Sequence, residues 1–287
     1  MLQVARMAPH LLRDSSDLVR DFLLGQLAAS GGFRDRDDRP DLYYTVFGID
    51  GLVALRVDPP LAPLSAFVDG FGDGDGLDFV HLACLARAIA SLGLDSSTAR
   101  RRRIAERMEA HRAADGGYHG KQGSASGTVY GSFLALGAYQ DLGLELPRPG
   151  AMLASLDVLE TDDGAWANEP SMHTGTTTAT AAAVAIRRHL GAPARDGVAA
   201  WILAARHESG GFLAMPRAPM PDLLSTATAL HALSGLETPL EPLRDDCLDF
   251  VDTLWTNDGG FYGHWAEERL DCEYTWYGLL ALGHLSL

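Results

Sequence analysis

A Gly-Gly-aromatic triplet recurs along the chain, and it is the feature that most limits the fold. Each copy precedes an apolar segment rich in Ala, Thr and Gly, and the period is about 47 residues. A repeat of this length is typical of stacked supersecondary units that bury their apolar faces against one another. The full copies are Gly31-Gly32-Phe33, Gly116-Gly117-Tyr118, Gly210-Gly211-Phe212 and Gly259-Gly260-Phe261, and the weaker ones are Asp69-Gly70-Phe71 and Asp163-Gly164-Ala165-Trp166.

Each unit is predicted to contain two helices. The first is amphipathic and charged, as in 18–29, 98–113, 151–159, 194–206 and 243–254. The second is apolar on nearly all sides and therefore buried; its six copies cover 45–55, 82–92, 130–139, 179–186, 226–236 and 275–285. An Asp just before the second helix would cap its free N–H groups. The column at this position holds Asp41, Asp78, Ala125, Gly175, Asp222 and Asp271.

The ends of the array predict its closure. Six units fill the chain, so we expect residues 1–287 to form a single domain. An open array needs atypical polar units at its ends, but the first unit resembles the last and the middle ones. The predicted fold is therefore all-α, a closed (α/α)6 barrel, or toroid, of six two-helix repeats.

The charge of the chain excludes some classes of partner. Lys and Arg number 23 and Asp and Glu 38, which gives a net charge of −15. Such a surface repels phosphate backbones and anionic lipid, so we expect no nucleic-acid partner. No stretch is long and apolar enough for a membrane span, and no signal peptide is recognised. Three unpaired cysteines exclude a disulfide framework. We expect a cytoplasmic protein.

The repeat resembles that of protein prenyltransferase β-subunits and of class II terpene cyclases such as squalene–hopene cyclase. The resemblance covers essentially the whole chain. The segment Thr45-Val46-Phe47-Gly48-Ile49 is close to the terminal repeat of Rab geranylgeranyltransferase β-subunits. Both families use α/α barrels, so the resemblance implies the same fold and the handling of an isoprenoid. It is less specific for activity, because one barrel hosts several chemistries.

The transferase resemblance implies a zinc site that this chain has altered. The family takes Asp and Cys from an Asp-x-Cys-Tyr segment and His from the Asp-x-x-His-Thr of the next unit. Here Asp271 and Tyr274 match, but Glu273 stands where Cys is expected and Tyr44 where His is expected. Tyr is a poor zinc ligand. His81 copies the His pattern, but its upstream partner segment lacks a thiolate. We therefore expect no metal site. Any bound zinc would have to use this altered ligand set.

The transferase resemblance also implies a cationic diphosphate pocket and a separate helical partner subunit. Before the last inner helix the chain carries His264 and Arg269, but Glu267 and Glu268 stand between them. A diphosphate needs several converging cations, so these carboxylates weaken a prenyl-diphosphate transfer function.

The cyclase resemblance implies a different use of the same segment. Class II cyclases protonate an alkene or epoxide with the middle Asp of Asp-x-Asp-Asp-Thr, held protonated by burial. In Asp271-Cys272-Glu273-Tyr274-Thr275, Glu273 takes the acid position and Asp271 would orient it. The letters Asp35-Arg36-Asp37-Asp38 match too, but they lie in a polar stretch that we interpret as a solvated loop.

The starts of the inner helices would form the barrel mouth. Aromatic residues concentrate in the first and last units, and small ones on the opposite side. This favours a deep apolar pocket for a polyisoprenoid, although the same residues could simply pack the axis. Asp50 would need a partner such as Arg87 or His231. The expected catalytic residues are Glu273, Asp271 and Tyr44, and the expected substrate-binding residues are Tyr43, Phe47, His81, Tyr130, His231, Tyr274, Trp276 and Tyr277.

Three functions stay open. The first is an isoprenoid- or lipid-handling enzyme related to prenyltransferases, with altered zinc and diphosphate sites. The second is a small class II cyclase-like enzyme that uses Glu273 as proton donor, with aromatic walls to stabilise cations. The third is a non-catalytic barrel that binds lipid or another protein.

Overall fold

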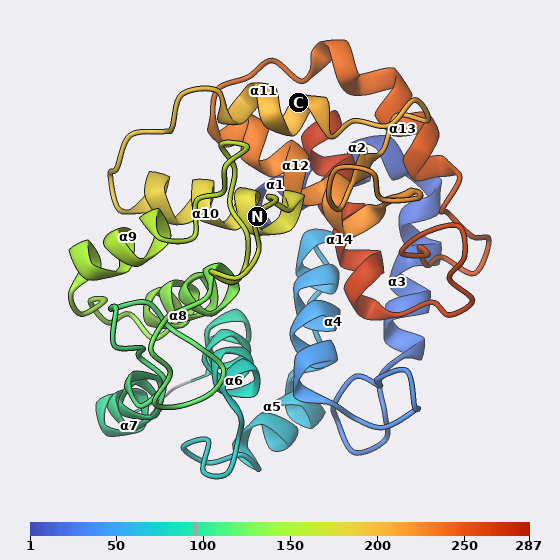
Figure 1. Ribbon diagram of the computed structural model, residues 1–287. Coiled ribbons are helices and arrows are strands. Elements are labelled where there is room, and N and C mark those ends of the chain that lie inside the picture. Colours follow the sequence, from blue (N-terminus) through green and yellow to red (C-terminus); the bar gives the residue numbers. More distant parts are fainter. Residues whose placement is uncertain (95–96) are drawn as a thin grey trace.

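Six buried helices form a closed ring around one axis in the computed structural model, which describes residues 1–94 and 97–287 (Figure 1). Each contacts the next along the chain, and the last contacts the first, so the ring is closed. This confirms the predicted toroid. The inner helices are α4 (Leu42–Ala54), α6 (Phe79–Ser91), α8 (Val129–Asp141), α10 (Thr177–His189), α12 (Leu223–Gly235) and α14 (Cys272–Leu285).

The outer helices pack against the outside of this ring and alternate with the inner ones along the chain (Figure 1). They are α3 (Ser16–Gly25), α5 (Leu61–Asp69), α7 (Thr98–Glu109), α9 (Pro149–Asp157), α11 (Val198–Ala204) and α13 (Arg244–Asp252). Outside the repeat, the chain adds α1 (Leu2–Ala5), α2 (Pro9–Leu12), the 3-10 turns η1 (Arg13–Ser15) and η2 (Glu241–Leu243), and an antiparallel pair of short strands, β1 (Phe212–Leu213) and β2 (Pro221–Asp222).

A side-chain cap begins every inner helix. Asp41, Asp78, Asp222 and Asp271 each accept a hydrogen bond from a backbone N–H of the first turn. In the third and fourth units the caps are Thr128 and Thr176, so the expected positions Ala125 and Gly175 are wrong. A threonine hydroxyl accepts the same bond as a carboxylate, and an alignment on aspartate misses it. Because the caps lie outside the apolar segments, the inner helices also begin before the expected starts.

A buried hydroxyl ties each inner helix to the aromatic residue before it. Four residues after the cap, a Thr or Ser accepts the N–H of the aromatic residue, at 2.9 to 3.4 Å. Thr45 and Thr226 also donate to the carbonyl of their own cap, so both ends of the loop are fixed. The five pairs are Thr45–Phe33, Ser132–Tyr118, Thr180–Trp166, Thr226–Phe212 and Thr275–Phe261. The second unit has Leu82 at this position and lacks the bond.

The first glycine of the triplet lets the loop touch the outer helix of the following unit. The φ angles of these first glycines lie between 89° and 102°, and a Cβ on each would overlap the next outer helix. The four residues are Gly31, Gly116, Gly210 and Gly259. For Gly259 of the last unit, that helix is α3 of the first, at Leu18. The contact closes the ring.

The outer helices depart from expectation at their ends. The predicted helix over 194–206 is reduced to α11, because Gly197 at φ 80° in the left-handed region precedes its first turn. The second unit contains α5, and its Gly70 has a negative φ, unlike the first glycines of the full triplets. Among the described residues, no helix has the length and apolar character that crossing a bilayer requires.

Gly259→Ala tests the closure contact against Gly164→Ala. Both glycines have positive φ, but a Cβ on Gly164 meets nothing within 4 Å, whereas one on Gly259 overlaps Leu18. We expect Gly164→Ala to cost about 1–2 kcal/mol of unfolding free energy and Gly259→Ala about 1–3 kcal/mol more. Urea denaturation measures both. Equal losses would contradict a closed and tightly packed seam.

Thr226→Val tests the hydroxyl bond. The change keeps the shape but leaves the buried N–H of Phe212 without its partner, which should cost about 1–3 kcal/mol. Thr238→Val is the control, since the Thr238 hydroxyl makes no hydrogen bond to the described residues. Chemical denaturation of both variants gives the comparison, and a loss below 0.5 kcal/mol for Thr226→Val would contradict the role assigned to the bond.

Candidate functional site

The first turns of the inner helices project side chains toward the axis two residues after each cap. On α4, α8 and α14 these residues are Tyr43, Tyr130 and Glu273. The Tyr43 hydroxyl donates to Glu273 Oε1 at 2.6 Å, across the seam between the first and last units. The charge of Glu273 also acts on Tyr130 and helps to raise its pKa, after the larger effect of burial. Closure of the ring therefore brings these side chains of the first, third and last units together at the mouth.

A second layer of side chains lies below this one. Phe47 packs on Tyr43 and Tyr277, with ring centroids 5.0 and 5.8 Å apart. Phe47 and Tyr277 remain partly accessible to water although they lie inside the ring. On the far wall, Ala182 and Ala185 of α10 are also partly accessible. The axis at this level is therefore lined on one side by aromatic side chains, and these residues keep part of their surface accessible to water.

Three residues after each cap, side chains reach back to the preceding unit. His81 lies between two carboxylates, with Nε2 3.1 Å from Asp41 Oδ2 and Nδ1 2.9 Å from Asp78 Oδ1. Burial would lower the pKa of His81, but these carboxylates outweigh it and raise that pKa. Carboxylates only accept, so this arrangement favours the protonated ring, in which both nitrogens donate. Tyr44 and Tyr274 hold the equivalent positions near Asp271 and Asp222.

Arg36 covers the seam, and it was missed in the sequence because the stretch around it was interpreted as a solvated loop. Its Nε donates to Asp271 Oδ2 at 2.8 Å, and its Nη1 lies 3.0 Å from Glu267 Oε2. The guanidinium also stacks on the Tyr274 ring, 5.3 Å from the centroid. Asp271, which is 3% exposed, is thus held by Arg36 and by its own helix. The signal in the sequence was the alternation of basic residues, Arg34, Arg36 and Arg39, with acidic ones.

Burial sets the protonation of Glu273. Removal from water raises its pKa to about 6, and the charge of Asp271 acts in the same direction. The hydrogen bond from Tyr43 and the charge of Arg36 oppose the rise. Exclusion of the remaining water by an apolar ligand would raise the pKa further. Glu273 can therefore hold a proton near neutral pH inside a cation-tolerant aromatic wall, which suits a proton donor.

The other predicted residues lie apart from this cluster. Trp276 is 3% exposed and packed within the helices, so it offers little surface to a ligand. His231 lies deeper, where its Nδ1 is 3.0 Å from His284 Nε2. Burial lowers the pKa of His231 to about 4. Asp50 pairs with Arg87, one of its two predicted partners.

The residues at the altered zinc positions do not fit that metal. Cys272 is fully buried and one residue away from the axial position, Glu273 accepts from Tyr43, and Asp271 is paired with Arg36. The remaining ligands would be the second carboxyl oxygen of Glu273 and the phenol of Tyr44. Zinc disfavours such a ligand set. Within the described ranges, no group of three or more His, Cys, Asp or Glu is arranged to hold a metal ion.

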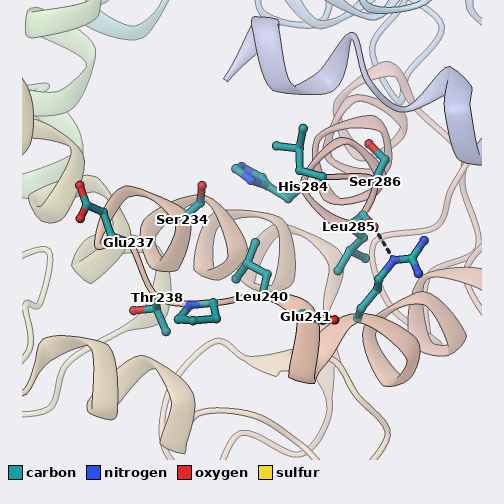
Figure 2. Close-up of a pocket in the computed structure, with 11 residues that line it drawn as sticks. Ser234, Glu237, Thr238, Leu240, Glu241, His284, Leu285 and Ser286 are labelled. Carbon is teal, nitrogen blue, oxygen red and sulfur yellow. Dashed lines mark hydrogen bonds between the residues drawn. The ribbon is translucent and has the colours of Figure 1, made fainter.

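Two surface grooves lie away from the mouth. The larger, about 640 Å³, lies where α12 and α14 end, between η2 and the last turn of α14 (Figure 2). His284 and Leu285 line it, so about 17 Å of helix separates it from Glu273. The second, about 420 Å³, lies outside the ends of α8 and α10. Neither includes a residue of the axial cluster, and we place the candidate site at the mouth, where the titratable groups converge.

Solved structures share this fold. A type II terpene cyclase from Scytonema, in complex with geranylgeranyl dihydroxybenzoate, is 14% identical, with 97% of both chains covered and a TM-score of 0.66. Protein geranylgeranyltransferase-I of Candida albicans, complexed with GGPP, is 12% identical over 94% of this chain and 90% of that one, with a TM-score of 0.69. An α-1,6-mannanase of Salegentibacter also matches, at 13% identity and a TM-score of 0.62 over 95% and 98% of the two chains.

At these identities the similarity shows the fold alone, and the three proteins differ in chemistry. Among curated proteins, no relative matches the sequence. The family model for the prenyltransferase alpha-alpha toroid domain matches residues 7–67, 74–194 and 189–285. The chain therefore belongs to the prenyltransferase alpha-alpha toroid family.

Proposed function

We propose that this protein binds an isoprenoid in the axial space and protonates it through Glu273, as a small class II cyclase-like enzyme. The observation that carries the proposal is the Glu273 carboxyl, half-buried at the mouth with a pKa raised to about 6 and held by the Tyr43 hydroxyl at 2.6 Å. Structural neighbours supply independent support, since two of them are complexed with geranylgeranyl compounds.

The proposed step transfers one proton. The Glu273 O–H bond breaks, the π electrons of a ligand double bond form the new C–H bond, and a carbocation results. A later C–H bond of the cyclised cation breaks, its electrons form the product double bond, and the proton leaves to water. Glu273 regains a proton from water at the mouth, so the reaction is an isomerisation. Tyr43 positions the carboxyl, while Asp271 stays paired with Arg36.

The aromatic walls suit the cation. Tyr43, Phe47 and Tyr277 form a continuous set of ring contacts on the α4 and α14 side of the axis. The faces of such rings attract a positive charge, and a dry site strengthens that attraction. Tyr130 is 43% exposed at the mouth and would cover the ligand from the α8 side.

The mouth favours proton transfer over prenyl-diphosphate transfer. A diphosphate would meet Asp271, Glu267 and Glu273 there, and Arg36 is already shared between two of these carboxylates. Arg269 donates to the carbonyl of Arg36, so it stabilises the loop that spans the seam between the first and last units. A transferase function would also need the helical partner subunit that the family resemblance implies.

Glu273→Gln tests the assignment of the acid. The amide keeps the size of the carboxyl and cannot donate a catalytic proton, so turnover should fall by at least about a thousandfold. The assay follows cyclised products of geraniol, farnesol and geranylgeraniol by gas chromatography and mass spectrometry. Native mass spectrometry should show that the variant still binds the ligand.

Glu268→Gln is the matched control, because Glu268 is exposed in the same loop region and outside the axis. It should leave turnover unchanged. Turnover retained by Glu273→Gln would overturn the acid assignment. Binding without turnover in the unmodified protein would overturn catalysis and favour a lipid-binding barrel.

Tyr43→Phe tests the control of the proton. The unmodified enzyme needs Glu273 protonated, so its rate should be greatest at low pH and fall about tenfold per pH unit above a midpoint near 6. Loss of the Tyr43 hydroxyl removes a bond that stabilises the ionised form. The pKa of Glu273 should therefore rise, and the midpoint should move up by about 0.5–1 unit.

The pH profile of kcat measures the shift. Tyr139→Phe is the control, since Tyr139 also donates to a glutamate, Glu109, but outside the axis, at 2.8 Å. It should leave the midpoint in place. A midpoint that moves down in Tyr43→Phe would contradict the proposed role of the hydroxyl.

A further inference from the structure

Loops of neighbouring units support the starts of four inner helices. At α8, α10, α12 and α14, the loop of the following unit makes a hydrogen bond to the first turn or to the cap, at 2.8 to 2.9 Å. The bonds are Tyr130 N to Asn168 Oδ1, Thr177 N to Ala214 O, Leu223 N to Gly263 O and Arg36 Nε to Asp271 Oδ2. In the described part of the chain, the loop of the second unit makes no such bond to the start of α4.

His81 of α6 makes this connection in place of a loop. Its Nε2 lies 3.1 Å from Asp41 Oδ2, in the cap of α4, and its Nδ1 lies 2.9 Å from Asp78 Oδ1, in the cap of α6. The second unit is also the one with Leu82 in place of the hydroxyl that fixes the loop in the other five. Among the described residues, His81 therefore provides the hydrogen bonds that join the starts of α4 and α6.

Asp41 transmits this contact to the candidate site. Its Oδ1 accepts from the backbone N–H groups of Tyr43 and Tyr44 at 2.8 and 3.1 Å. Its Oδ2 is the oxygen that His81 holds. The Tyr43 hydroxyl in turn donates to Glu273 Oε1 at 2.6 Å. A continuous series of contacts therefore leads from His81 through Asp41 and Tyr43 to the proposed proton donor.

The charge of His81 suits it to this task. Asp41 and Asp78 outweigh the effect of burial and raise the pKa of His81, and hydrogen bonds between a cation and a carboxylate are stronger than neutral ones. Both ring nitrogens face protein carboxylates, so neither is directed at a ligand. Without the ring, two like charges would face each other, and their repulsion would favour movement of the Asp41 carboxyl away from the start of α4.

We propose that His81 is a positioning residue, which holds Asp41 on the first turn of α4 and thereby keeps the Tyr43 hydroxyl on Glu273. The inference rests on the proposed function, because the position of Tyr43 affects catalysis only if Glu273 is the proton donor. His81 itself takes no part in proton transfer. Its effect on Glu273 should therefore depend on the presence of the Tyr43 hydroxyl.

His81→Gln, made with and without Tyr43→Phe, tests this dependence. The hydroxyl of Tyr43 lowers the pKa of Glu273. Glutamine lacks the charge of His81 and holds Asp41 less firmly, so that pKa should rise by about 0.3–1 unit. In the Tyr43→Phe background the same change should add less than about 0.1 unit. The pKa is read by 13C NMR of protein labelled at the glutamate carboxyls, and the Glu273 signal is the one absent from Glu273→Gln.

His173→Gln is the matched control, because His173 is exposed in the loop before α10, and it should leave the pKa of Glu273 in place. His81→Arg keeps a charge and two donors and should restore most of the shift. An equal shift in both backgrounds would show that His81 acts by its charge alone, and this or the absence of any shift would overturn the inference. The measurement needs no turnover, so absence of isoprenoid turnover would overturn the proposed function and leave this coupling intact.

The unmodified protein decides if circular dichroism shows that His81→Gln is unfolded. 15N NMR of the histidine rings should then show both nitrogens of His81 protonated at pH 7, where an unperturbed imidazole is mostly neutral. A neutral His81 ring at that pH would overturn the inference, because a neutral ring can donate to only one of the two carboxylates.

Discussion

The hydrogen bond from a triplet aromatic N–H to a buried hydroxyl four residues after the helix cap is the interaction on which the rest of the ring depends. In five of the six units it sets the register of the inner helix against its loop, as in Thr45–Phe33 and Thr275–Phe261. That register decides which side chains meet the axis. Because the first and last units share it, Tyr43 and Glu273 fall at equal depth and bond across the seam. A shift of one residue would turn either side chain away from the axis.

Much of this architecture follows from periodicity in the sequence. The repeat predicted six units, the apolar segments predicted the buried helices, and the similarity of the end units predicted closure. Given closure, Asp271, Glu273 and Tyr44 occupy the positions of a family site, although Glu273 and Tyr44 replace its Cys and His, and this predicted that the first and last units meet there. These inferences succeed because they rely on helical period and burial, which the local sequence determines.

The remainder depends on contacts between residues distant in the chain. Arg36 lies 235 positions from Asp271, and its loop gives no local signal of that pairing. The threonine caps at Thr128 and Thr176 were hidden by loop lengths that differ between units. Asp50 pairs with Arg87 of the neighbouring inner helix, whereas the sequence left a choice between two partners for Asp50. Such features come from tertiary geometry rather than from periodicity.

The contact of Gly259 with Leu18 has a kinetic consequence. It joins the first and last units, so it carries one of the largest loop-closure entropies available to the chain, and contacts of such long sequence separation slow folding. Glu273, the proposed proton donor, and Tyr43, which donates a hydrogen bond to it, belong to the two sides of that seam. A nascent chain, or one whose last repeat has detached, therefore lacks this pair. The proposed site is assembled only when the ring closes.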